Sequence, residues 1–188
     1  MASLKDVITA YSSFSPQEES DRLAMLSLLA ERPAILTRED TLTHFTSSAW
    51  VMDPERASVL MVHHNIYNAW SWIGGHADGE QDLFAVAKRE LTEETGLDKA
   101  VPVLSSPLSL EIIGVQAHEK RGVYVQPHLH LNLTWFFEAE KDVSLRIKPD
   151  ENSGVAWRRT EDVLADKTEP HMNVLYHKVI AKIKEQNL

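Results

Sequence analysis

Residues 75 to 97 read GHADGEQDLFAVAKRELTEETGL, a glycine-rich acidic turn followed by a helical pattern. Apolar residues recur on one face of this helix, at Leu83, Val86, Ala87 and Leu91. Asp82 has the side chain of an N-cap residue, and Gly96 suits the left-handed position that closes a helix. The stretch therefore predicts a turn that leads into an amphipathic helix over residues 82 to 95.

Three acids of this helix, Glu90, Glu93 and Glu94, stand at positions i, i+3 and i+4, so their carboxylates share one face. A solvated acidic surface, with Arg89 paired to Glu93, is the commoner meaning of such a pattern. Here the helix follows a Gly-Gly turn, whose backbone can approach a ligand closely. Hard oxygen ligands beside such a turn are typical of Mg²⁺ or Mn²⁺ sites. The pattern favours a site where a divalent ion joins a diphosphate to an acidic protein.

The acidic composition of the chain means that an anionic substrate would need a local cation at such a site. The chain has 188 residues, with 28 acids against 19 Lys plus Arg and a net charge of −9. No run of basic residues marks a face for a phosphate backbone, so duplex nucleic acid is not an expected partner. A small phosphorylated substrate needs an Arg, a Lys or a metal ion to meet its charge.

Cysteine is absent, which excludes disulfides, thiolate metal sites and thiol nucleophiles. The N-terminal segment has no apolar stretch of secretory length, and nowhere do 18 apolar residues run together. We therefore expect a cytoplasmic protein without a membrane partner.

The first 36 residues are predicted to form a helical extension. Ser15 is an N-cap candidate, Pro16 suits the first helical position, and Glu18 would complete a capping box. The apolar face of the extension could pack on the main domain, residues 37 to 188, or on a second copy of the chain in a homodimer.

The rest of the chain alternates short β-type runs with helices. The β-type runs are 44–53, 56–64, 69–73, 101–104, 109–117, 123–126, 129–138 and 154–158, and the later helices are 160–166 and 171–186. Strands, a central helix, more strands and a terminal helix indicate an α+β protein, an α/β/α sandwich with a mixed β-sheet.

Residues Gly75 to Leu97 resemble the Nudix box, whose pattern is Gly, five residues, Glu, seven residues, Arg-Glu-aliphatic-any-Glu-Glu-any-Gly-aliphatic. The resemblance implies a Nudix-type fold and hydrolysis of a nucleoside diphosphate linked to another group, by water that Mg²⁺ or Mn²⁺ activates. Matched position by position, the implied metal ligands are Gly75, Glu90, Glu93 and Glu94. The implied catalytic residues are Arg89, which orients the acids, Glu93, and Glu151 as a remote base.

One position departs from the box. Strict counting puts Gln81 where the first Glu belongs, with Glu80 one place early. Either the loop is one residue shorter and Glu80 takes the position, or Gln81 fills it as a neutral hydrogen-bonding partner. The first is favoured, because a turn after Asp78 and Gly79 is reset by one residue more easily than acids borne by a helix.

The run HLHLNLTW, residues 128 to 135, alternates polar and apolar side chains. A strand would present a polar face of His128, His130, Asn132 and Thr134 and a core face of Leu129, Leu131, Leu133 and Trp135. The polar face is a solvated sheet surface, a substrate-lining face, or a second metal site that takes in His64, His76 or His118. The expected substrate-binding residues are His76, Glu80, Trp72, His128 and His130; for Trp72, core packing is the alternative to stacking on a base.

Two other functions compete with hydrolysis. A Nudix domain that binds a nucleotide as a sensor or regulator is the first, but a pure binder has no need for clustered like charges. Isopentenyl-diphosphate isomerase is the second, but its catalytic cysteine has no counterpart here. We therefore expect a metal-dependent pyrophosphohydrolase that acts on a nucleotide derivative.

Overall fold

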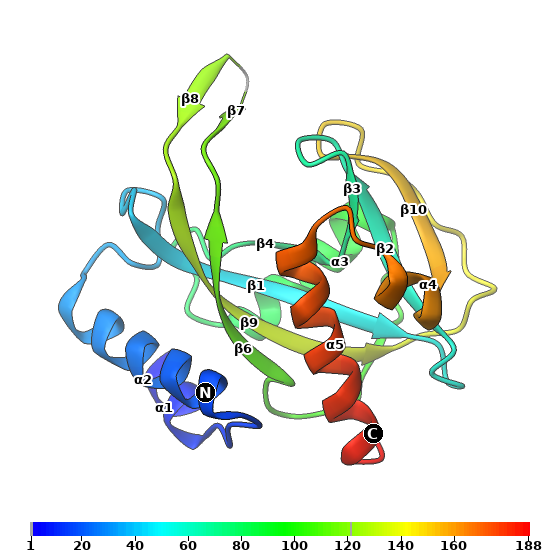
Figure 1. The fold of residues 1–188 in the computed structure, drawn as a ribbon, viewed down its shortest axis with the longest axis horizontal. Helices are drawn as coiled ribbons and strands as arrows, with labels where there is room; N and C mark the ends of the chain where they lie inside the picture. The colour runs from blue at the N-terminus through cyan, green and yellow to red at the C-terminus, as the bar shows by residue number, and fades with distance from the viewer. Residues whose placement is uncertain (1, 121) are drawn as a thin grey trace.

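A mixed β-sheet forms the middle layer of the structure (Figure 1). The computed structural model describes residues 2–120 and 122–188. Its sheet strands are β1 (Thr43–Met52), β2 (Ser58–His64), β3 (Ala69–Ser71), β4 (Ile73–His76), β5 (Val101–Pro102), β6 (Ser109–Val115), β9 (His128–Glu138) and β10 (Asn152–Arg159). Within the described residues the order is β10–β2–β1–β9–β5, with β3 on β2, β4 on β1 and β6 on β9. The antiparallel ribbon of β7 (His118–Lys120) and β8 (Val123–Val125) projects from this body.

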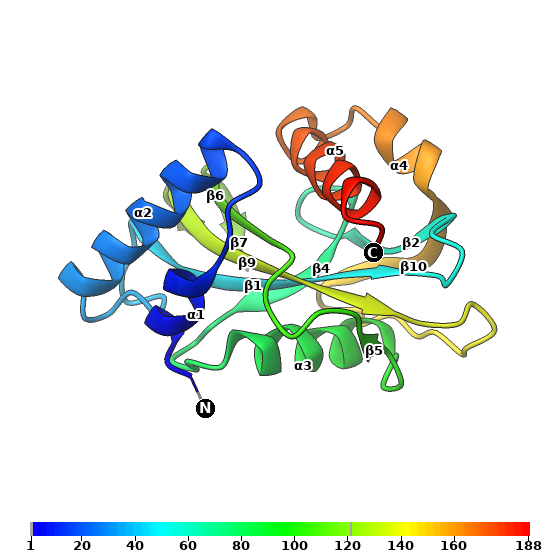
Figure 2. The same cartoon turned by 90° about the horizontal axis from the view of Figure 1, so that it is seen from below.

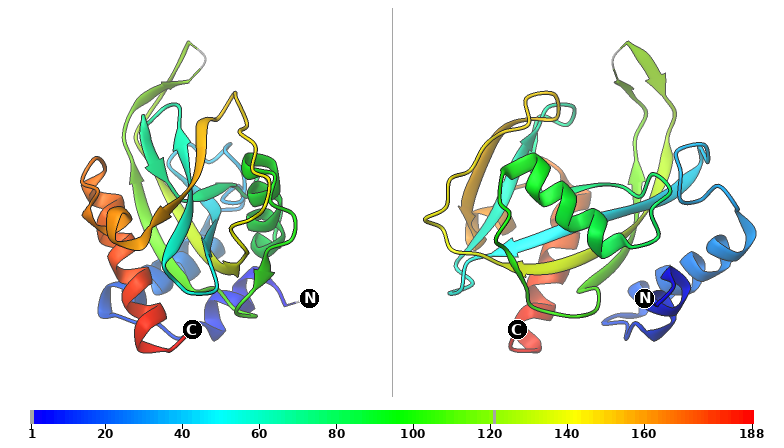
Figure 3. Two further views of the ribbon diagram at one scale, coloured as in Figure 1. Left: turned by 90° about the vertical axis from the view of Figure 1, so that its right-hand side faces the viewer. Right: turned by 180° about the vertical axis from the view of Figure 1, so that it is seen from behind.

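Helices cover both faces of the sheet (Figure 2). They are α1 (Leu4–Ala10), α2 (Pro16–Glu31), α3 (Leu83–Thr95), α4 (Thr160–Ala165) and α5 (Pro170–Glu185). Helix α3 packs on one face, and α5 packs on the other, as the views of Figure 3 also show. The fold is therefore the α/β/α sandwich that the sequence predicts.

Strand β1 holds the layers together. All ten of its residues are buried, because it pairs in parallel with β9 on one edge and with β4 and β2 on the other. Its side chains alternate between the two layers. Phe45, Ala49 and Val51 join the core beneath α3, whereas Trp50 and Met52 join the core beneath α5.

The N-terminal extension packs on its own chain. Leu4 and Ile8 of α1 and Met25 of α2 are buried in the same core as α3. Ser15 caps α2 by accepting a hydrogen bond from the Glu18 amide, as expected, but the capping box is a wrong prediction. The Glu18 carboxylate accepts from the Phe14 amide at 2.5 Å instead.

Glu18 is fully buried and joins α2 to α5 and β6. Its carboxylate lies 3.2 Å from Lys178 Nζ and accepts a hydrogen bond from Ser109 Oγ at 3.0 Å. Burial opposes ionisation, but the lysines and the Phe14 amide lower the pKa of Glu18 overall. The extension is thus fixed to the sheet by a buried ion pair.

Replacing Glu18 with Gln should lower the free energy of unfolding by about 3 kcal/mol, because removing one partner of a buried ion pair leaves the other charge poorly compensated. Chemical denaturation followed by circular dichroism measures the change. Glu19→Gln changes the neighbouring residue, whose partly exposed carboxylate pairs with Arg22, and it should cost less than about 1 kcal/mol. Equal losses in the two variants would contradict the buried-pair account.

Local signals predicted most boundaries correctly. Asp82 caps α3 by accepting from the Ala85 amide, and Gly96 closes it at a φ of 77°. The prediction of one strand over 69–73 is wrong, because the segment divides into β3 and β4 around Trp72. The short strand β7 was not predicted. Among the described residues, none of the helices has the length and apolar character needed to cross a membrane.

Candidate active site

Three carboxylates from distant parts of the chain meet beside α3. Glu90 and Glu94 lie one turn apart on the helix, and Glu151 comes from the loop before β10. One carboxylate oxygen of each lies within 4.8 Å of those of the other two. Like charges at this separation repel unless a cation or a proton compensates them.

Glu94 is the most buried of the three, with 3% of its surface exposed. Burial raises the pKa of Glu94 to about 8, against the opposing effect of a 3.1 Å hydrogen bond from the Gly74 amide. Burial, together with the neighbouring Glu93, also raises the pKa of Glu90. The nearby basic residues do not outweigh burial at Glu90 and Glu94, so a divalent cation fits the donor set.

Two basic residues border the carboxylates. Lys148 Nζ lies 3.0 Å from Glu93 and 3.1 Å from Glu151, so it links α3 to the loop before β10. Burial works against its charge, but hydrogen bonds to the two acids raise the pKa of Lys148. Arg89 lies 3.5 Å from Glu90 and 3.9 Å from Glu93, which suits the orienting role expected of it. Glu93 itself lies outside the closest trio and on the lysine side of the site.

Asn152 was not singled out from the sequence, yet it joins the two halves of the site. It is fully buried and donates a hydrogen bond to the Glu94 carbonyl at 3.1 Å. Its side-chain oxygen accepts from the Lys148 amide at 3.2 Å. The sequence feature that could have identified Asn152 is its position next to Glu151, at the start of a strand.

Gly75 leaves the space that Glu90 occupies. A Cβ atom at this position would lie 2.5 Å from Glu90 Cδ, closer than real Cβ contacts allow. A side chain at this position would therefore push the Glu90 carboxylate away from β4, and glycine lets it lie there.

Gly75→Ala should lower kcat/KM by roughly 10²-fold, because displacement of a catalytic group by about 1 Å has effects of that size. Steady-state kinetics measures the loss. Gly114→Ala on β6 is the matched control, since nothing lies within 4 Å of its Cβ position. Similar activity in the Gly75→Ala and parent proteins would show that Glu90 needs no such confinement.

Glu80 and Gln81, the two candidates for the first acid of the box, face the N-terminal segment. Glu80, Gln81 and Asp82 line a groove with Ser3 and Leu4 of the N-terminal segment. Glu80 is exposed and accepts a hydrogen bond from the Asp82 amide at 3.1 Å. The acids of the trio are Glu90, Glu94 and Glu151, so neither Glu80 nor Gln81 belongs to the closest carboxylate group.

A histidine cluster lies on the opposite side of β4. His44, His76 and His130 each offer a ring nitrogen within 4.8 Å of the others, and the His128 ring centre lies 4.9 Å from that of His130. His44 was not singled out from the sequence, whereas His76, His128 and His130 were. The ring of His64 lies against Tyr67, and His64 is not one of the three histidines that meet.

The polar face of β9 is not a solvated surface along its whole length, which corrects one interpretation of the HLHLNLTW run. Asn132 and Thr134 are buried and hydrogen-bond to Glu111 on β6. On the other face Leu129 is 42% exposed instead of lying in the core. Only the histidine end of the polar face reaches the surface.

Trp72 takes the core-packing alternative. It is 8% exposed, and its ring lies edge-on to Trp50 and Tyr176 in the core beneath α5. This position is not one from which the ring can stack on a nucleotide base.

The class of protein follows from comparing the sandwich fold and its carboxylate site with known families. The family model described as NUDIX domain matches residues 42–179, which is more than half of the chain. The chain therefore belongs to the Nudix family. No curated protein matches the chain.

Solved structures share this fold at low sequence identity. A C. elegans Ap4A hydrolase binary complex is 15% identical, with a TM-score of 0.55, and the match covers 74% of this chain and 98% of that one. The NUDIX domain of Shewanella oneidensis NrtR, complexed with ADP ribose, is 19% identical with a TM-score of 0.54 and coverages of 86% and 97%. The MutT protein from Methanosarcina mazei Go1 is 16% identical with a TM-score of 0.53 and coverages of 74% and 94%.

Proposed function

We propose that the chain hydrolyses a pyrophosphate bond in a nucleoside diphosphate linked to another group, with Mg²⁺ or Mn²⁺ as cofactor. The observation that carries this proposal is the meeting of Glu90, Glu94 and Glu151 within 4.8 Å. The proposed ligands of the ion are Glu90, Glu93, Glu94 and the Gly75 carbonyl, and Glu151 stands beside them. A bound ion would neutralise phosphate oxygens and make water a better nucleophile.

The side chains of the site have separate roles in this proposal. Glu151 accepts the proton of the attacking water, since its side chain is more exposed than that of Glu90 or Glu94 and stands on a loop. Arg89 and Lys148 hold the acids in position through their ion pairs. The Gly74 amide fixes Glu94, so the acids are oriented before substrate arrives.

A nucleotide derivative is the proposed substrate class. Of two proteins of the same fold, one is named an Ap4A hydrolase and the other is complexed with ADP ribose. We also propose that the domain division lies near residue 36, with the extension outside the catalytic unit, that the protein is cytoplasmic, and that its partners are small phosphorylated molecules.

A substrate panel with and without Mg²⁺ tests the function. It should include ADP-ribose, Ap4A and nucleoside triphosphates, and phosphate or nucleotide release is measured. Metal-dependent turnover of one class is expected. Binding without turnover, independent of metal, would favour the sensor alternative instead.

Glu80→Gln should leave turnover and metal dependence close to those of the parent, because Glu80 is exposed and bonded within its own loop. Kinetics at several Mg²⁺ concentrations measures both. A large loss in this variant would mean that the loop moves Glu80 to the carboxylate trio when metal binds.

A further inference from the structure

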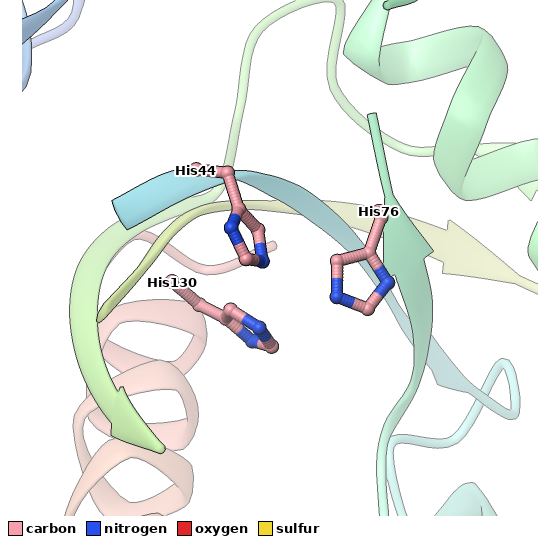
Figure 4. Close-up of side chains that lie close together, drawn as sticks. All are labelled: His44, His76 and His130. Carbon is pink, nitrogen blue, oxygen red and sulfur yellow. The ribbon is translucent and has the colours of Figure 1, made fainter. Parts of the chain in front are cut away.

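The histidine cluster lies outside the carboxylate site, and none of the steps proposed for hydrolysis uses it, although His76 and His130 were expected from the sequence to contact substrate. Its members come from three strands: His44 from β1, His76 from β4 and His130 from β9, and their rings converge on a common space (Figure 4). The strand pairing explains the convergence. His44 lies opposite His130 in the parallel pair, and His76 lies opposite Thr46, two residues along the same face of β1.

Strand β4 separates the two sites. Successive residues of a strand point to opposite faces. The Cβ direction of Gly75 meets Glu90 on α3, whereas the His76 ring lies 5.0 Å from the rings of His44 and His130. The carboxylates and the imidazoles are therefore two distinct donor sets on either side of one strand.

The hydrogen bonds of His44 fix its tautomer for metal binding. Its Nδ1 lies 3.0 Å from the Asp40 carbonyl oxygen, which only accepts, so Nδ1 carries the proton. Nε2 is then unprotonated and carries a lone pair. It is buried without a hydrogen-bond partner in the part of the chain that the structure describes. The residue is 4% exposed, so solvent water does not readily reach this atom. A backbone carbonyl on the far nitrogen is the usual outer contact of a metal-bound histidine.

His128 is prepared in the same way. Its Nδ1 lies 2.9 Å from the Gln126 carbonyl oxygen, and its Nε2 lies 3.1 Å from Nε2 of His130. Backbone carbonyls thus hold Nδ1 of both His44 and His128, and Nε2 is the nitrogen of each ring that the backbone leaves free of such a contact.

We propose that His44, His76 and His130 form a binding site for a zinc-class divalent ion, with His128 or water as the fourth ligand. Neutral imidazoles select Zn²⁺, Co²⁺ or Ni²⁺ over Mg²⁺, which takes oxygen ligands. Tetrahedral Zn–N bonds set the nitrogens ~3.4 Å apart, so the rings close in by roughly an ångström through side-chain rotation. His76 and His130 are half-buried, which gives the ion a route from solvent. The ion would join β1, β4 and β9 next to the box.

Calorimetric titration with Zn²⁺ tests the site, on untagged protein stripped with chelator and kept in millimolar Mg²⁺ so that the carboxylates are occupied. One equivalent of Zn²⁺ should bind, and Co²⁺ should give the strong visible absorption of a four-coordinate ion. His76→Gln and His130→Gln should each weaken binding at least ~100-fold, since even outer-contact losses reach that range. His177→Gln, an exposed histidine on α5, should bind as the parent does.

Two results would overturn the proposal. One is that all Zn²⁺ binding is lost in excess Mg²⁺ or in Glu94→Gln, which would place the bound Zn²⁺ at the carboxylates. The other is that one equivalent of Zn²⁺ binds to His76→Gln and to His130→Gln with the affinity of the parent. Both variants alter half-buried side chains, and circular dichroism confirms that each is folded before titration. Hydrolysis is not the readout, so this test and the substrate panel succeed or fail separately.

Discussion

Glu94→Gln is expected to lower kcat/KM by ~10²–10⁴-fold, because charge stabilisation by a held metal ion contributes several kcal/mol and each 1.4 kcal/mol is a factor of ten. Gln keeps the shape of the side chain and can still accept the hydrogen bond from the Gly74 amide. The change therefore removes the charge and little else. Steady-state kinetics across Mg²⁺ concentrations measures the loss, with Glu80→Gln as a control in the same box.

The same variant should make the metal-free protein more stable at alkaline pH. A carboxyl whose folded pKa is raised from 4.5 to about 8 destabilises the fold progressively as the pH rises between these values. Above pH 8 the parent carries this cost in full, of the order of a few kcal/mol at roughly 1.4 kcal/mol per pKa unit. Gln does not ionise, so thermal unfolding at pH 9 without metal should give it the higher Tm.

A gain in stability with a loss of activity would separate function from folding. If Glu94→Gln lost both, Glu94 would be a structural residue whose charge the fold requires. If it kept full activity, the carboxylate trio would not be the catalytic metal site. Added Mg²⁺ should raise the Tm of the parent more than that of the variant.

Local features were predictable from the sequence. The caps of α3, the acids on its face and the turn before it depend on residues close together in the chain, so their spacing is enough. The resemblance to the Nudix box extended this local pattern to a fold, and it drew attention to Glu151. What the box could not predict was that Lys148 would link Glu93 to Glu151.

Features that depend on strand register were not predictable. His44 and His130 are neighbours only because β1 and β9 pair in parallel, and the two strands lie far apart in the sequence. The alternation in β9 indicated a polar face but not what would cover it. Glu111 and Lys178, from β6 and α5, turn half of that face into a buried network.

Glu151→Gln is expected to reduce kcat by ~10²–10⁴-fold, the usual contribution of a general base. The residue stands on a loop and supplies the only member of the carboxylate trio that does not come from α3. If it acts as the base, kcat should fall while KM and the Mg²⁺ concentration needed for half-maximal rate change little. A role limited to metal binding would instead raise the Mg²⁺ concentration needed for half-maximal rate.

Asp150→Asn is the matched control, because it neutralises the preceding carboxylate of the same loop and lies outside the trio. Its kcat should stay within a few-fold of the parent value. A Glu151→Gln variant with the same small change would move the base to another acid. Glu90 would then be the first candidate, since its pKa is raised by burial and its carboxylate meets the same group. Glu138 is a weaker one, because Arg56 holds it at 2.6 Å.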